Sequence, residues 1–136
     1  MILQYPAEME QLRAMLQQTE QAAAELGVDD QRRLLLVLIA EELIVNIINH
    51  AYAATGRGFV RIELQEADAN TVRLTIIDQG SAFNPLTREE PDLASGLNER
   101  KVGGLGIHLT RQLAEKMTYQ RTEDCNVLAI GFRKSA

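Results

Sequence analysis

The chain has 136 residues, of which 46% are hydrophobic, and its formal net charge at pH 7 is −5. This length suits one domain with a sizeable core. The negative charge argues against nucleic acid as a direct partner, because a phosphate backbone requires clustered Lys and Arg. The one cysteine, Cys125, has no partner within the chain for a disulfide, which fits a reducing compartment.

The N-terminal stretch MILQYPAEME lacks the basic and apolar regions of a secretory signal. The longest apolar runs are shorter than the about 20 residues that a bilayer requires. We therefore expect a single cytoplasmic domain, residues 1–136, without a membrane partner.

Apolar spacing predicts the elements of the first half of the chain. Residues 2–5 favour a short strand, and residues 7–26 have helical spacing that Gly27 ends. A second helix is expected from a cap at Asp29 or Asp30 to about residue 52. Residues 59–67 and 71–78 then alternate apolar and polar side chains, which predicts a hairpin.

The second half begins with a long irregular segment, residues 79–104, that carries prolines, glycines and charges without any period. Loops of this length inside compact domains are uncommon and often functional. Helical spacing resumes over residues 106–117, and residues 117–124 and 126–134 favour a closing hairpin. Helices packed on one face of a sheet give an α+β fold, a two-layer α/β sandwich.

A polar stripe interrupts the apolar second helix. One step of about 100° per residue puts Asn46 and Asn49 within about 40° of Glu42. His50 lies at the edge of the stripe. A solvent-exposed helix end would explain these residues, but the flanking Ile, Val and Leu side chains favour a pocket mouth. Glu42 could serve as a general base, and the Asn46 side-chain oxygen suits Mg²⁺.

Two glycine-bearing motifs follow. In LTIIDQGSAF, Asp78 ends an apolar strand, where it could accept a hydrogen bond from an amino group such as that of adenine. Gly80 would allow a sharp turn or the close approach of a ligand. In KVGGLGIHL, the residues Gly103, Gly104 and Gly106 precede or open a helix, where backbone N–H groups form an anion site. The alternatives are an ordinary strand-ending turn and a flexible hinge.

Together, the three motifs resemble those of the GHKL or Bergerat-fold ATPases. ELIVNIINHAY is similar to the N box of that superfamily, DQGSAFNP to its first glycine box and GGLGIHL to its second. Residues 79–104 then correspond to the ATP lid. PAEMEQLRAML and YQRTEDCNVL extend the resemblance toward the anti-sigma-factor serine/threonine kinases. The resemblance implies a histidine-kinase-like fold with a mixed sheet covered on one face by helices.

The resemblance also implies roles for individual residues. Glu42 would be catalytic, Asn46 would bind Mg²⁺, and Asp78 would bind the adenine amino group. Either Arg100 or Lys101 would contact the terminal phosphate. The implied ATP-binding residues are Asn46, Asn49, His50, Asp78, Gly80, Arg100, Lys101, Gly103, Gly104 and Gly106.

These expectations describe a kinase that binds MgATP, phosphorylates a serine of a STAS-type anti-sigma-factor antagonist and sequesters a sigma factor. A non-catalytic ATP-binding module and a detached catalytic domain of a two-component histidine kinase remain alternatives, and a homodimer is possible. The last hairpin departs from the resemblance. It reads TEDCNV where many superfamily members have a glycine and a threonine, so no nucleotide contact is predicted there.

Overall fold

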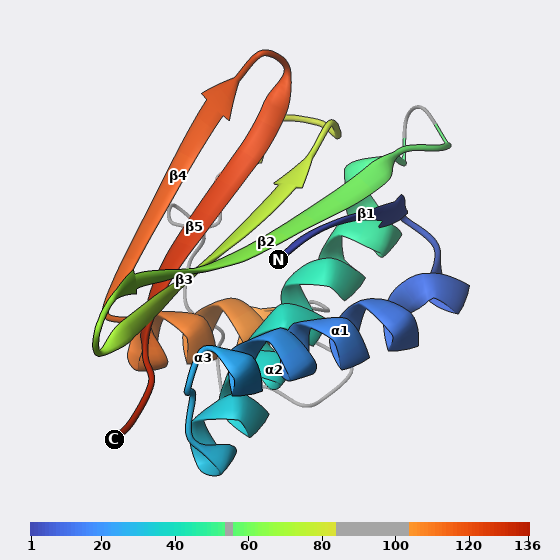
Figure 1. The fold of residues 1–136 in the computed structure, drawn as a ribbon. Helices are drawn as coiled ribbons and strands as arrows, with labels where there is room; N and C mark the ends of the chain where they lie inside the picture. The colour runs from blue at the N-terminus through green and yellow to red at the C-terminus, as the bar shows by residue number, and fades with distance from the viewer. Residues whose placement is uncertain (54–55, 84–103) are drawn as a thin grey trace, which may run out of the picture.

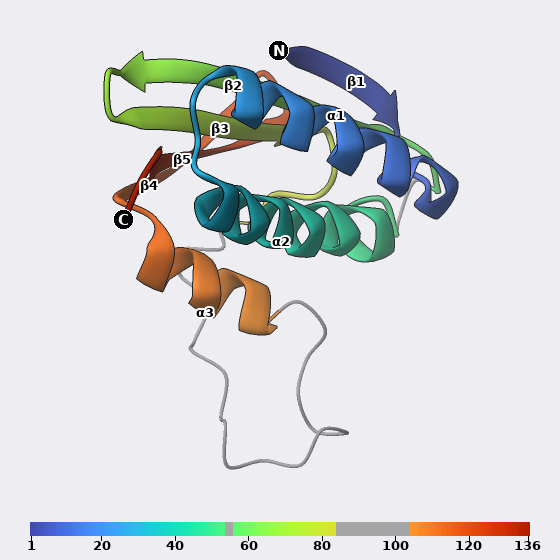
Figure 2. The same ribbon diagram turned by 60° about the horizontal axis from the view of Figure 1, so that its bottom comes forward.

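A computed structural model describes residues 1–53, 56–83 and 104–136. Five strands form one sheet in the order β1-β2-β3-β5-β4, and the helices cover one of its faces (Figures 1 and 2). The expected two-layer α+β architecture is therefore confirmed. The strands are β1 (Ile2–Pro6), β2 (Phe59–Asp68), β3 (Thr71–Asp78), β4 (Lys116–Thr122) and β5 (Cys125–Arg133).

The expectation of a mixed sheet is wrong, because every neighbouring pair among the described strands is antiparallel. β3 and β4 do run in the same direction, but β5 lies between them in the sheet. The chain therefore returns from β4 through a tight turn and inserts β5 beside β3. Glu123 and Asp124, both with positive φ, form this turn, as a two-residue hairpin loop of type I′ requires.

The helical segments are a 3₁₀ turn (Met9–Gln11), α1 (Leu12–Glu25), α2 (Asp30–Asn46), a π-helical turn (Ile47–Ala51) and α3 (Gly104–Leu113). The first helix begins later than predicted, since Glu8 is still extended. Gly27 ends it with a positive φ of 87°, as expected. Asp29 occupies the N-cap position of α2, but its side chain makes no capping hydrogen bond.

The core lies between the sheet and α2. Alternate residues of the three central strands face the helices, and one side of α2 is buried against them. These central side chains are Val60, Ile62, Leu64, Val72, Leu74, Ile76, Leu128, Ile130 and Phe132 from the sheet, and Leu36, Ile39, Ala40, Leu43 and Ile44 from α2. Their position explains why LLLVLIA and the residues after it are so apolar.

The helical run Asp30–Ala51 has 22 residues and is long and apolar enough, by length and composition, to cross a membrane. The expectation that every apolar run is too short is wrong by this criterion. It considered only uninterrupted apolar runs, whereas the criterion allows a few polar residues within the helix. A core helix meets the same criterion, and burial against the sheet accounts for the apolar side of α2.

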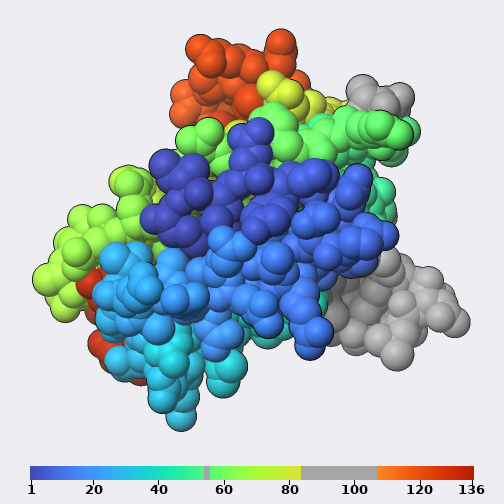
Figure 3. Space-filling view, turned by 45° about the vertical axis from the view of Figure 1, so that its right-hand side comes forward, coloured from blue at the N-terminus to red at the C-terminus, as the bar shows by residue number. Residues whose placement is uncertain are grey.

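The N-terminal strand closes the edge of the sheet beside β2. Strand β1 and helix α1 lie side by side on this face (Figure 3). The Met1 ammonium group donates to the Leu64 carbonyl at 2.9 Å, and Gln18 of α1 donates to the Tyr5 hydroxyl. The first contact holds the N-terminus beside β2, and the second holds α1 against β1. Helix α1 in turn packs along α2 (Figure 2).

Candidate nucleotide-binding site

Asn46 is the most unusual polar residue of α2. It lies one helical turn after Glu42, and both side chains are half-buried. The Asn46 Oδ1 atom is itself buried and has no hydrogen-bond partner in the described part of the chain. A buried acceptor without a partner is costly, and a missing ion or ligand is one of the accepted explanations. Asn46 therefore fits a cation that prefers oxygen ligands.

Asn49 and His50 lie in the π-helical turn that follows α2, and both are exposed. A π-helical turn has more residues per turn than an α-helix. The step of 100° that grouped these residues with Glu42 therefore no longer applies beyond Asn46. Their assignment to the pocket stays a prediction, whereas Glu42 and Asn46 share one face of a regular α-helix.

Asp78 ends β3 on the face that packs against the helices and is only 5% exposed. Its Oδ1 atom accepts from the Gly80 backbone N–H at 2.8 Å and from Asn126 Nδ2 at 3.0 Å. Within the described residues Oδ2 accepts no hydrogen bond. Among the residues that the structure describes, one carboxylate oxygen is thus held by the protein and the other is left as an acceptor for an amino group.

Gly80 brings the first glycine motif into contact with the end of the second helix. A Cβ atom at this position would lie 2.3 Å from the Ala51 carbonyl oxygen and 2.6 Å from the Ala51 Cβ. The Ser81 backbone N–H donates to the same carbonyl at 3.1 Å. Gly80 lies in a bend, and the space beside it is filled by the protein itself, so its predicted contact with a ligand stays a prediction.

Tyr52 joins the same two segments. Its hydroxyl accepts from the Gln79 backbone N–H at 2.8 Å and donates to the Phe59 carbonyl, and the residue is only 8% exposed. Burial raises the pKa of the Tyr52 phenol above its ordinary value, partly offset by the hydrogen bond from Gln79. Tyr52 therefore supports the wall of the site.

Asn126 was not predicted for the site, yet it contacts Asp78 directly. It lies opposite Asp78 in the register of β3 and β5 and is 7% exposed. The sequence does contain a signal for it: Leu128, Ile130 and Phe132 alternate along the same buried row of β5, and Asn126 is its polar first member.

The second glycine motif lies at the start of α3, which begins at Gly104, two residues before the predicted start. Gly104 and Gly106 therefore lie in its first turn, where backbone N–H groups lack intrahelical acceptors. Gly103, Arg100 and Lys101 lie outside the described residues. Helix α3 packs beside α2, the helix that carries Glu42 and Asn46 (Figure 2).

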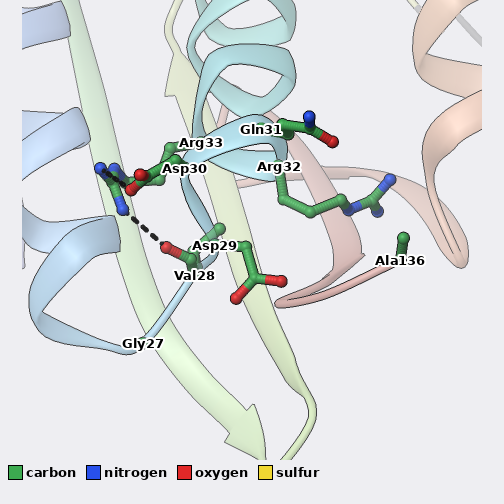
Figure 4. A pocket seen from close by; sticks show the side chains of 8 residues that line it. All are labelled: Gly27, Val28, Asp29, Asp30, Gln31, Arg32, Arg33 and Ala136. Atoms are coloured by element: carbon green, nitrogen blue, oxygen red, sulfur yellow. Dashed lines mark hydrogen bonds and ion pairs between the residues drawn. The ribbon is translucent and has the colours of Figure 1, made fainter.

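A hollow of about 540 Å³ lies far from these residues, at the turn between α1 and α2 (Figure 4). Arg33 spans its rim by donating to the Val28 carbonyl at 2.9 Å and to Asp30 at 2.6 Å. Asp30 and Asn46 are the two ends of α2, about 24 Å apart at 1.5 Å per residue. The hollow is therefore separate from the polar residues that could hold a nucleotide.

In the described residues, no group of three or more His, Cys, Asp or Glu side chains could hold a metal. A Mg²⁺ site at Asn46 would not need such a group. Mg²⁺ often takes only one or two protein ligands and completes its shell with water and phosphate oxygens.

Solved structures show the same fold. A Mycobacterium tuberculosis protein with RsbU and RsbW domains aligns over 98% of this chain and 32% of its own length, with a TM-score of 0.63 and 18% identity. The histidine kinase domain of a blue-light activated kinase from Erythrobacter litoralis aligns over 89% of this chain and 60% of its own, with a TM-score of 0.56 and 18% identity. The described elements therefore have the fold of histidine-kinase-like ATPase domains.

The chain belongs to the histidine kinase-like ATPase domain family, whose model matches residues 5–132. One relative is the serine/threonine-protein kinase BtrW of Bordetella bronchiseptica. It is 32% identical over 98 residues, which are 72% of this chain and 68% of that protein. The resemblance stated from the sequence is confirmed at this level: the chain is a histidine kinase-like ATPase domain with a serine/threonine-protein kinase among its relatives.

Proposed function

We propose that this chain is a cytoplasmic, MgATP-dependent protein serine/threonine kinase. Its substrate would be a serine of a STAS-type anti-sigma-factor antagonist, and it would also sequester a sigma factor. The observation that carries the proposal is the buried, unpartnered Oδ1 of Asn46 one helical turn from the carboxylate of Glu42. Membership of the histidine kinase-like ATPase family supports the use of ATP. The relative that is itself a serine/threonine-protein kinase supports transfer to a protein hydroxyl.

In this proposal each of the described site residues has a separate role in binding MgATP or in the transfer. Asn46 Oδ1 would be the protein ligand that holds Mg²⁺, and Asp78 Oδ2 would accept a hydrogen bond from the amino group of the base. The N–H groups at the start of α3 face phosphate. Glu42 accepts the proton of the incoming serine hydroxyl. The serine oxygen would form a bond to the γ-phosphorus of ATP, and ADP would leave. Bound Mg²⁺ would neutralise charge on the phosphates, and positioning provides most of the rate enhancement in such transfers.

The transfer would also control the partners. A phosphoserine carries a charge of about −1.5 to −2 at neutral pH. The chain is itself acidic, with a net charge of −5, so a phosphorylated antagonist would be held less tightly. The kinase would then be free to bind the sigma factor.

The direct experiment incubates the purified chain with Mg²⁺, γ-labelled ATP and an antagonist encoded near its gene. We expect acid-stable label on a serine of the antagonist, and we expect Glu42→Ala to abolish transfer while ATP binding persists. Glu41→Ala, the neighbouring carboxylate on a different side of α2, is the matched control and should retain transfer. Loss of activity in the Glu41 variant but not in the Glu42 variant would refute the assigned base.

The fold similarity to histidine kinase domains supports one alternative, phosphorylation of a histidine in trans. Phosphohistidine is acid-labile, so label that acid removes would favour this alternative. Unchanged ADP release with and without antagonist, together with no labelled product, would favour a non-catalytic ATP-binding module.

A further inference from the structure

The side chain of Asn126 uses its complete hydrogen-bonding capacity around the start of the first glycine motif. Nδ2 donates to Asp78 Oδ1 at 3.0 Å and to the Ser81 carbonyl at 2.8 Å. Oδ1 accepts from the Phe83 backbone N–H at 3.2 Å and from the Tyr119 hydroxyl. A carboxamide has two N–H donors and one oxygen with two lone pairs, so no capacity is left over.

These partners also determine which way the amide points. The Ser81 carbonyl can only accept and the Phe83 backbone N–H can only donate. Exchanging the oxygen and nitrogen of Asn126 would therefore break both contacts. The nitrogen must face Asp78, and Asp78 Oδ1 must act as an acceptor.

This arrangement has a consequence for Asp78. Its Oδ1 atom faces two donors, the Asn126 amide and the Gly80 N–H, so the carboxylate is held in one rotamer as an acceptor. The remaining oxygen then presents lone pairs. A 6-amino group of a purine supplies the matching N–H donor. A 6-oxo group would instead place its own oxygen lone pairs against those of Asp78 Oδ2.

We infer that Asn126 is a positioning residue that holds Asp78 as an acceptor and thereby sets a preference for 6-amino over 6-oxo purines. The inference rests on the proposed nucleotide site and adds to it a residue from the hairpin for which no contact was expected. Arg121, which donates to the Gly80 carbonyl at 2.8 Å, shows that the same hairpin also holds the backbone of the motif.

The test compares ATP with ITP, which differ at the 6-position, by calorimetric titration in the presence of Mg²⁺. Asn126→Leu keeps the size of the side chain but removes both donors to the motif. We expect ATP affinity to fall by about tenfold or more, as for loss of a hydrogen bond to a charged group. ITP affinity should fall less, so the ATP-to-ITP ratio shrinks. Gln120→Leu, at an exposed position of the same hairpin, is the matched control and should leave the ratio unchanged.

Asn126→Asp provides a second test that does not depend on how well the leucine variant folds. It places two carboxylates side by side, which raises the pKa of the pair. Above that pKa they repel, and ATP binding should be weak. Below it the shared proton supplies the lost donor, so ATP affinity relative to the wild type should recover as the pH is lowered from about 8 to about 5. The wild type, titrated over the same range, corrects for protonation of the nucleotide.

The outcomes separate the two proposals. If the wild type binds neither nucleotide, the proposed function fails. If the wild type prefers ATP and both Asn126 variants keep that preference at every pH, the function stands and the role of Asn126 is refuted. A drop in the melting temperature of the unliganded variants with an unchanged ratio would assign Asn126 a purely structural role, which also refutes the inference.

Discussion

At the scale of single residues, Asn46 shows how a functional side chain can be recognised by an apparent defect. Protein interiors pair nearly all of their buried polar atoms. The Oδ1 atom of Asn46 is buried on the central helix without a partner in the described residues. A buried oxygen without a partner destabilises the folded chain. A bound ligand therefore explains the presence of Asn46 better than the stability of the fold does.

Asn46→Leu should therefore separate stability from function. Removing an unsatisfied oxygen should leave the free energy of unfolding of the unliganded chain unchanged or raise it by up to about 1 kcal/mol. The wild type should bind ATP more tightly in Mg²⁺ than in EDTA, and this difference should disappear in the variant. Denaturant unfolding and nucleotide titration measure the two quantities. A variant that is clearly less stable and still binds ATP in a Mg²⁺-dependent way would contradict the role of Asn46.

Gly80 shows a different residue-scale constraint, since the space beside it is filled by backbone. Gly80→Ala would force a methyl group against the Ala51 carbonyl, and we expect the free energy of unfolding to fall by about 1–3 kcal/mol. At Gly131 the nearest atom to an added Cβ is the Lys116 Cβ at 3.5 Å, an ordinary contact. Gly131→Ala is therefore the control. Equal effects of the two substitutions on urea unfolding would show that the contact with Ala51 is not rigid.

At the scale of elements, the site depends on the junction between the π-helical turn and the end of β3. Tyr52 bridges this junction with two hydrogen bonds to backbone groups. Tyr52→Phe leaves both groups without that partner, so we expect a loss of about 1–3 kcal/mol in the free energy of unfolding at neutral pH. The loss should be measured by chemical denaturation.

The same substitution should change the response to alkaline pH. Because the pKa of Tyr52 is raised in the folded chain, the unfolded chain releases this proton first. The unfolded state then binds fewer protons, and stability falls as the pH rises above about 10. Tyr52→Phe should remove this component of the alkaline loss. An identical pH profile in both proteins would show that the phenol is not buried as described.

Sequence periodicity predicted the helices and strands well, because alternating and helical patterns report directly on burial. It placed boundaries less well. The first helix begins at a 3₁₀ turn after extended Glu8, and β4 begins at Lys116, where helical spacing was still expected. The π-helical turn was also missed, since a local change of pitch leaves no clear mark in the pattern of apolar residues.

The parallel or antiparallel character of the sheet could not be predicted from periodicity either. It depends on where β5 inserts, and this is decided by packing between segments distant in the sequence. Asn126 was missed for the same reason. The alternation along β5 marks Asn126 as a polar member of a buried row, but its pairing with Asp78 follows only from the register of the two strands.

At the scale of the whole molecule, separate segments contribute complementary chemistry to one fold. The central helix provides Glu42 and Asn46, the end of β3 provides Asp78, the last hairpin provides Asn126, and α3 provides a helix N-terminus. The motifs predicted most of this set from the sequence. Gly103, Arg100 and Lys101 were assigned to the same site and lie outside the described residues, so their roles stay predictions.

A crystal structure with Mg²⁺ and a non-hydrolysable ATP analogue would test this assembly most directly. We predict that the 6-amino group lies within hydrogen-bonding distance of Asp78 Oδ2, that Mg²⁺ is bound by Asn46 Oδ1, and that phosphate oxygens face the first turn of α3. A nucleotide bound elsewhere, for example in the hollow beside Arg33, with Asn46 and Asp78 not in contact with it, would contradict the account.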